Sequence, residues 1–189
     1  MMNVSRKVSL IALLTAVSVA TDYLLVGVPN VKLMDGLVFL GANLFGFEVG
    51  GSVAILSWLV YGTINPYGSA TPGLLLVLMG GETTYALAGW GLRRLNLAVG
   101  SGMSRRVVLG FVGFVCAAIY DFITNVYTGI YFYAGPIWNR VVYSLIMGIP
   151  FSIIHEVSDF LVFMLVVPVL ISAFTRLGSE VKVESVATH

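Results

Sequence analysis

Residues 142–174 read VYSLIMGIPFSIIHEVSDFLVFMLVVPVLISAF, an apolar run that contains no lysine or arginine. A hydrocarbon core about 30 Å thick is crossed by about 20 helical residues, so this run is long enough to span a membrane. It is too long for one straight crossing. Gly148 and Pro150 therefore predict a break, with a short re-entrant or interfacial segment before a membrane helix over residues 151–174.

The rest of the chain has the same character. Hydrophobic residues make up 58% of the sequence and charged residues 10%, and the mean hydropathy is +0.96. Because soluble domains carry about 25% charged residues, this composition predicts an integral membrane protein. A net charge of +1 does not suggest a nucleic-acid partner.

We expect one all-α transmembrane domain over residues 1–189, a bundle of six transmembrane helices. A flexible cytoplasmic tail is expected over residues 176–189. The apolar stretches place the helices at about residues 8–28, 33–47, 49–64, 73–92, 107–131 and 151–174.

The basic residues predict the orientation of this bundle. Of the 10 lysines and arginines, only Lys32 and Arg140 fall on one side of a six-helix topology. The other side holds Arg6, Lys7, Arg93, Arg94, Arg105, Arg106, Arg176 and Lys182. Since cytoplasmic loops carry the excess of basic residues, both termini are expected in the cytoplasm.

Several ionisable side chains interrupt the predicted helices. A charged group at a helix centre costs about 2.5–3.5 kcal/mol on insertion scales, so such groups usually face a bundle interior, a cavity or a ligand. These residues are Glu82, Asp121, His155, Glu156 and Asp159.

Their spacing predicts convergence. At about 1.5 Å per residue, Glu82 lies about 13 Å below the outer surface, near the midplane. Asn125 lies one turn beyond Asp121 on the same face, and His155 and Asp159 also share a face. The fourth, fifth and sixth helices would thus line a cavity that opens outward. Alternatively, these groups satisfy one another as structural polar contacts between helices.

The signs of the charges bear on the ligand. Asp22 and Asp35 are expected near the outer ends of their helices, in contact with water. No cation accompanies the embedded acids, because Lys32 and Arg140 are placed at the rim. Such a site suits an uncharged or cationic ligand, for example a nitrogen heterocycle.

Two outer loops have unusual compositions. Residues 65–73 read NPYGSATPG, in which prolines and glycines specify turns. Residues 131–140 are rich in aromatic side chains. They predict either an interfacial aromatic belt or a lid over an outward-facing pocket, with Tyr67 and Trp138 as stacking residues.

Ala12, Ala16 and Ala20 follow one another at intervals of four residues and line one face of the first helix. Small residues at this spacing let helix backbones approach closely. The face either packs inside the bundle or docks another membrane protein.

Residues 155–159 read HEVSD, close to the H-E-x-x-H motif of zinc peptidases. The third metal ligand would have to be Asp121 or Glu82, because the other histidine is the terminal His189. No second catalytic signature and no nucleotide-binding motif accompany it. We therefore expect neither an enzyme nor a cofactor or metal site.

The chain resembles, over essentially its whole length, the substrate-binding S component of energy-coupling-factor (ECF) vitamin transporters. The resemblance rests on the alanine face of the first helix and on the order of several short segments. These are Pro29–Asp35, Phe45–Gly51, Asn65–Gly73 and the Gly148-Ile-Pro-Phe opening of the last helix.

This resemblance implies capture of a vitamin or related micronutrient at a prokaryotic cell membrane. Ala12, Ala16 and Ala20 would dock a transmembrane coupling protein that carries ATPase subunits. Ligand contacts are implied at Glu82, Tyr85, Asp121, Asn125, His155 and Asp159, with Asn65 and Tyr67 in the lid. A stand-alone proton-coupled carrier, with Glu82, Asp121 or Asp159 as proton relay, is the first alternative. An intramembrane metalloenzyme that uses His155, Glu156 and Asp159 of the HEVSD motif is the second.

Overall fold

The computed structural model describes residues 2–95 and 102–176, and within these ranges every regular element is a helix. The predicted all-α class is therefore confirmed. The helices are α1 (Val4–Leu24), α2 (Met34–Phe45), α3 (Phe47–Thr63), α4 (Pro72–Arg94), α5 (Met103–Phe132) and α6 (Ile137–Leu161). Apart from Arg176, the tail predicted over residues 176–189 lies outside the described residues.

Three helices of the described part are long and apolar enough to cross a membrane: Val4–Leu24, Met103–Phe132 and Ile137–Arg176. These spans support a multi-pass membrane protein. The last of them includes α6 and its continuation to Arg176.

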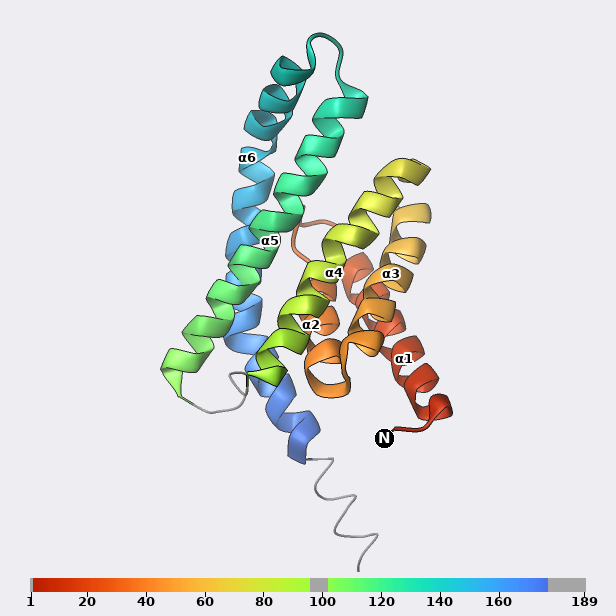
Figure 1. Cartoon of the computed structure of the whole chain (residues 1–189), viewed down its shortest axis with the longest axis vertical. Helices are drawn as coiled ribbons and strands as arrows, with labels where there is room; N and C mark the ends of the chain where they lie inside the picture. Colours follow the sequence, from red (N-terminus) through yellow and green to blue (C-terminus); the bar gives the residue numbers. More distant parts are fainter. Residues whose placement is uncertain (1, 96–101, 177–189) are drawn as a thin grey trace, which may run out of the picture.

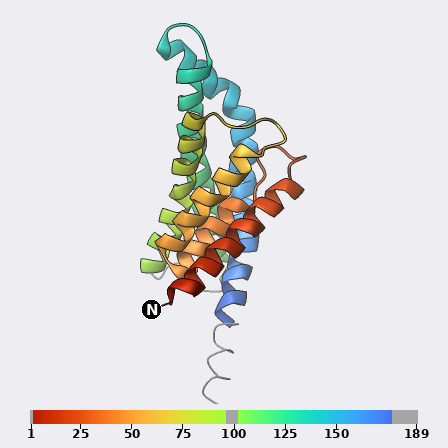
Figure 2. The ribbon, with the colours of Figure 1, turned by 90° about the vertical axis from the view of Figure 1, so that its right-hand side faces the viewer.

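The helices run roughly along one axis, and α5 and α6 extend well beyond the others at the upper end of Figure 1. The connections α1–α2, α3–α4 and α5–α6 lie toward this end. The N-terminus, the α2–α3 turn and the lower end of α6 lie at the opposite end, as Figure 2 also shows. Consecutive helices thus alternate in direction, as the predicted topology requires.

Helix α2 is short and central. It has 12 residues and is therefore about 18 Å long. Its Met34, Val38, Phe39 and Leu40 side chains are fully buried. Because α2 ends at the turn with α3 at the lower end, a helix of this length has its first turn inside the bundle rather than at the outer surface.

Two glycines allow α2 to pack closely against the neighbouring helices. Gly46 joins α2 to α3 with a φ of +105°, a left-handed conformation that side-chain-bearing residues rarely adopt. On α4, a Cβ at Gly89 would collide with the carbonyl oxygen of Phe39. The glycine at this position lets the α2 and α4 backbones pack closely, which fixes the position of α2 in the core.

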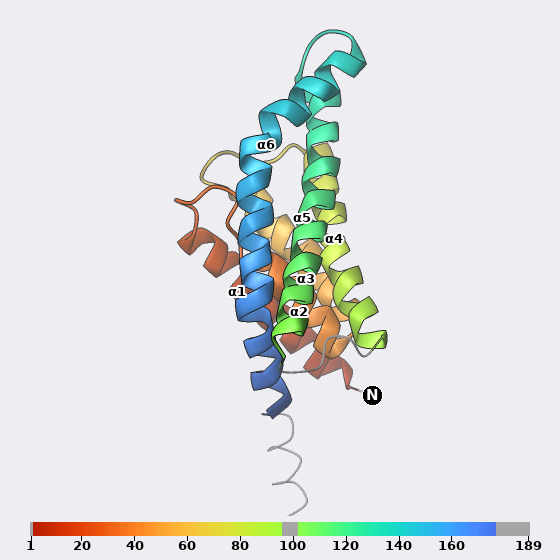
Figure 3. The same cartoon turned by 90° about the vertical axis from the view of Figure 1, so that its left-hand side faces the viewer.

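The predicted break before the last helix is wrong. Helix α6 begins at Ile137 and continues through Pro150, so no separate re-entrant or interfacial segment precedes it. The missing N–H of Pro150 bends the helix without ending it, as the upper part of α6 shows in Figure 3. This upper part packs on α5, where Gly129 leaves room for the backbone of Val141.

Below Leu161 the last helix widens into a π-helical turn, Val162–Val166. The N–H of Val167 there bonds to the carbonyl of Val162, five residues earlier. Pro168 follows directly and has no N–H to donate, so a wider turn accommodates its ring. Phe163, inside this turn, is fully buried.

Candidate functional site

Side chains from three helices meet around His155, which is only 1% exposed. Its Nδ1 lies 3.0 Å from Oδ1 of Asp121 on α5, and its Nε2 lies 3.0 Å from Oδ2 of Asp35 on α2. Oδ2 of Asp159, one turn along α6, lies 3.8 Å from the same Nε2. We name these four residues the central cluster. The structure brings Asp121, His155 and Asp159 together, as their spacing predicted.

The expected contact of Asp22 and Asp35 with water is wrong. Asp35 is fully buried because α2 is short and its first turn lies inside the bundle. Asp22 is 1% exposed, and its Oδ1 accepts the N–H groups of Leu33 and Met34 at 3.2 and 3.3 Å. Asp22 thus satisfies backbone donors at the start of α2, where a carboxylate is favoured.

Helix α4 contributes two more of the predicted residues, Glu82 and Tyr85. The Tyr85 hydroxyl donates to Oδ2 of Asp159 at 2.6 Å. The indole N–H of Trp58, on α3, donates to Oε2 of Glu82 at 3.0 Å. All of these side chains are buried, which places Glu82 and Tyr85 beside the central cluster.

Sequence reasoning missed Trp58 and Tyr120, which form an aromatic wall. Their rings stack with centroids 6.0 Å apart and an interplanar angle of 22°. Tyr120 also meets the ring of His155 edge-on at 5.6 Å. A signal was present, because a buried tryptophan needs an acceptor for its N–H and Glu82 was already recognised as an embedded acid.

The prediction that Lys32 lies at the rim, away from the embedded acids, is wrong. Its Nζ lies 4.4 Å from the Trp58 ring centroid and 5.2 Å from that of Tyr120, in the geometry of cation–π contacts. Burial acts to lower the pKa of Lys32, but nearby carboxylates, Asp35 first among them, oppose this and leave that pKa raised. A charged lysine therefore accompanies the buried acids, which sequence reasoning had excluded.

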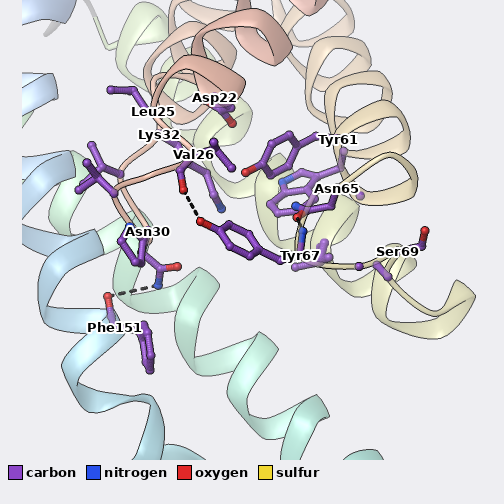
Figure 4. A pocket seen from close by; sticks show the side chains of 18 of the residues that line it. Asp22, Leu25, Val26, Asn30, Lys32, Tyr61, Asn65, Tyr67, Ser69 and Phe151 are labelled. Carbon is purple, nitrogen blue, oxygen red and sulfur yellow. Dashed lines mark hydrogen bonds between the residues drawn. The ribbon is translucent and has the colours of Figure 1, made fainter.

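Two adjoining cavities lead from the loops toward the central cluster. The outer cavity, of about 370 Å³, is drawn in Figure 4 and includes Tyr61, Asn65 and Tyr67 in its lining. The inner cavity, of about 220 Å³, reaches Asp121 and His155. Both are lined by Asn30, Lys32, Trp58, Leu78 and Phe151. These shared residues make the outer cavity the approach to the inner one.

Hydrogen bonds join the two loops that cover the outer cavity. The Tyr67 hydroxyl donates to the carbonyl of Val26 at 2.7 Å, and Asn65 Oδ1 accepts the N–H of Tyr67 at 2.8 Å. Asn30 Nδ2 donates to the carbonyl of Phe151 on α6 at 3.2 Å. Figure 4 shows the first and third of these contacts as dashed lines. The α3–α4 loop thus contacts the α1–α2 loop, which in turn contacts α6.

Trp138 does not belong to this site. It is 75% exposed in the first turn of α6, at the end of the α5–α6 hairpin that projects beyond the bundle. Neither the outer nor the inner cavity includes it in its lining. Its predicted stacking role is wrong because α5 and α6 carry this loop past the cavity mouth.

A third cavity, of about 320 Å³, lies laterally between α5 and α6, and Asn125 and Glu156 line it. Asn125 lines both this cavity and the inner one, and its amide packs against Gly148. Glu156 lines the lateral cavity together with Asp121. The glutamate of the HEVSD motif therefore does not join His155 and Asp159 on the side that faces Asp35.

Ala12, Ala16 and Ala20 are exposed on α1. The opposite face of this helix carries its buried residues, Leu14, Ser18 and Asp22. Within the described residues the alanine face is therefore not covered by another helix, and the packing alternative for it is wrong.

The chemistry of the site follows from these contacts. The aromatic wall offers a stacking surface, Lys32 and Asn65 offer hydrogen-bond donors, and the buried carboxylates offer acceptors. The site has the mixed apolar and polar lining of a small-molecule pocket. Comparison of the chain with known protein families, with curated proteins and with solved structures finds no match.

Proposed function

We propose that this chain is the substrate-capture S subunit of an ECF-type importer. In this proposal all six helices together cross the membrane and both termini lie in the cytoplasm. The subunit binds a vitamin or related small heterocycle in the outer and inner cavities. It then docks to a transmembrane coupling protein whose ATPase subunits supply the energy.

One observation carries the proposal: two adjoining cavities lie beneath hydrogen-bonded loops and end at a buried ionisable cluster. The outer cavity, at about 370 Å³, falls in the range of about 300–1,000 Å³ that small-molecule sites occupy. The apolar lining with a few convergent polar groups supports recognition of one solute.

The lining favours an uncharged or cationic heterocycle. Trp58 and Tyr120 are both buried, and their stacked rings provide an aromatic surface beside Lys32 for a heterocyclic ring. The carboxyl groups around them outnumber the one lysine that lines the cavities. A strongly anionic solute would meet these acids, whereas a ring carrying N–H groups would donate to them.

The outer surface of α1 and the ends of the helices support the remainder of the proposal. Arg93 and Arg94 lie in the last turn of α4, and Arg105 and Arg106 lie near the start of α5. These helix ends lie at the same end of the bundle as the N-terminus (Figure 1). These four arginines are therefore gathered at one end, as expected for the cytoplasmic side.

The test is a thermal-shift and native mass-spectrometry screen of the purified chain against vitamins and nucleobases. A ligand present at 100 times its Kd stabilises the folded state by about 2.7 kcal/mol. Trp58→Ala is expected to abolish this shift, while Trp138→Ala retains it. If no compound shifts the wild type, or if both variants bind alike, capture in this cavity is contradicted.

Docking needs its own test. Ala16→Trp should leave ligand binding intact but prevent co-purification of a coupling protein and abolish uptake in cells, because its bulk blocks close helix approach. Val17→Trp is the matched control beside it, since Val17 is also exposed on α1 but lies off the alanine face. Unchanged uptake in Ala16→Trp would refute the docking part of the proposal.

The connected acids favour one second candidate, a proton-coupled carrier. Asp35, Asp121 and Asp159 all contact the buried His155, and such chains serve as proton relays in transporters. Reconstitution of the chain alone in liposomes distinguishes the two. Uptake driven by an imposed proton gradient, without partner proteins, would support the carrier and contradict the S subunit.

A further inference from the structure

We infer that Asp35, His155 and Asp159 bind one divalent transition-metal cation at the base of the inner cavity. This inference concerns a site beneath the proposed ligand pocket, and it does not depend on the proposed importer function. It rests on four independent features: the positions of the ligand atoms, their outer partners, the unpaired oxygens around them and the access path.

The ligand atoms lie close together. One atom each from Asp35, His155 and Asp159 falls within 4.8 Å of the others, and all three residues are buried. The His155 Nε2 lies 3.0 Å from Asp35 Oδ2 and 3.8 Å from Asp159 Oδ2. Ligands about 2.0–2.2 Å from a common ion can stand at these separations, so small rotamer changes suffice to bind one.

Outer partners orient two of the three ligands. The His155 Nδ1 lies 3.0 Å from Asp121 Oδ1, which accepts the Nδ1 proton, and its Nε2 lies 3.0 Å from Asp35 Oδ2. A bound cation would displace the proton from Nε2, whose lone pair then faces Asp35 and Asp159. This is the carboxylate–histidine–metal arrangement of protein metal sites. Tyr85 likewise donates to Asp159, which holds that carboxylate in place.

Unpaired buried oxygens point to a cation. Oδ1 of Asp35, Oδ1 of Asp159 and Oε1 of Glu82 are buried and receive no hydrogen bond from any residue in ranges 2–95 and 102–176. All three residues are fully buried. Because an unpaired buried carboxylate oxygen is costly, a cation bound among these three oxygens would satisfy positions that Lys32 and His155 leave open.

The donor set selects the class of ion. A histidine nitrogen with carboxylate oxygens suits zinc, cobalt or manganese, whereas magnesium and calcium prefer oxygen ligands alone. The inner cavity reaches His155 and adjoins the outer cavity, which gives such an ion a path from outside. Lys32 lies along this path on the aromatic wall, where its charge would influence the rate of entry.

The experiment uses the full chain with a non-histidine affinity tag and His189→Ala, which removes the only other histidine. The detergent-purified protein is stripped with a chelator and titrated with Co²⁺ alone. Bound metal is counted by inductively coupled plasma mass spectrometry, and visible absorption reports the coordination. We expect one equivalent of cobalt and a ligand-field spectrum that Zn²⁺ abolishes by displacement.

Variants separate ligands from their partners. His155→Ala should lose the cobalt spectrum. Asp121→Asn and Tyr85→Phe should weaken binding by about 10–100-fold, as loss of outer partners does at other sites. Glu156→Gln, which faces the lateral cavity, should bind as the wild type does.

Two results would overturn the inference: a folded stripped protein that takes up no stoichiometric cobalt, or full binding in Asp121→Asn and His155→Ala. If His155→Ala does not fold, the Asp121→Asn and Tyr85→Phe titrations still decide. Heterocycle binding by the stripped protein would uphold the proposed function while metal binding fails, so the two outcomes remain distinguishable.

Discussion

The first turn of α2 and the tip of the α5–α6 hairpin contrast sharply. Asp35, in the first, is fully buried and contacts His155. Trp138, in the second, is 75% exposed and stands beyond the rest of the bundle. Both segments follow loops on the same side of the molecule, and sequence reasoning assigned the water-exposed position to Asp35 and the pocket to Trp138.

Helix length explains the reversal. A 12-residue α2 cannot reach from the lower turn to the outer surface, so its first turn and Asp35 remain inside. The 30 residues of α5, about 45 Å long, carry the following loop well past the cavities. In a bundle of unequal helices, depth depends on where each helix starts and ends rather than on which loop a residue adjoins.

The strongest test of this contrast compares His155→Leu with Trp138→Ala. Loss of the histidine leaves Asp35, Asp121 and Asp159 buried without their common partner. Breaking a buried ion pair costs about 3–5 kcal/mol. Trp138→Ala should change the unfolding free energy by about 0.5 kcal/mol or less, as an exposed substitution does. Denaturant unfolding in detergent measures both, and equal stabilities would remove the distinction between the two regions.

The next largest difference in stability is expected between Tyr85→Phe and Tyr131→Phe. Tyr85 donates a 2.6 Å hydrogen bond to the buried Asp159, whereas Tyr131 is 67% exposed at the end of α5. Hydrogen bonds to charged groups contribute about 1.5–3 kcal/mol, so only Tyr85→Phe should lower the melting temperature clearly. A melting temperature unchanged in both would show that Asp159 does not depend on this donor.

The position of α2 can be tested at Gly89. Gly89→Ala places a Cβ against the carbonyl oxygen of Phe39 and should destabilise the protein by about 1–3 kcal/mol. Gly91→Ala, two residues later on α4, meets no heavy atom within 4 Å and should be neutral or stabilising by up to about 1 kcal/mol. Opposite signs in unfolding experiments would confirm the close approach, and equal signs would argue against it.

The smallest effect is expected at the loops. Tyr67→Phe removes the hydrogen bond to Val26 and should cost about 0.5–1.5 kcal/mol. Because this bond joins two loops, the loss should appear as faster hydrogen exchange of backbone amides in residues 25–33, with little change in the α5–α6 tip. Equal exchange rates of residues 25–33 in the wild type and in Tyr67→Phe would show that the Tyr67 contact does not order these loops.

Much of the fold was predictable from local patterns, but much of the site was not. Apolar runs and turn residues located α2 to α5 within about four residues at each end, and period-four spacing identified the shared face of His155 and Asp159. The roles of Asp35, Lys32 and Trp58 depend on contacts between distant segments. No local pattern reveals that α2 begins inside the bundle or that an adjacent loop carries Lys32 onto an aromatic wall.

The π-helical turn of Val162–Val166 affects the phase of the last helix. His155, Asp159, Phe163, Val167 and Ile171 are all buried, at successive intervals of four residues. In an unbroken α-helix of 3.6 residues per turn, such a series would rotate by about 160° around the axis. The wider turn absorbs part of that rotation. Removing a single residue there would rotate the rest of the helix about its axis and turn Val167 and Ile171 away from the core. Length changes in this segment should therefore be tolerated far less than substitutions.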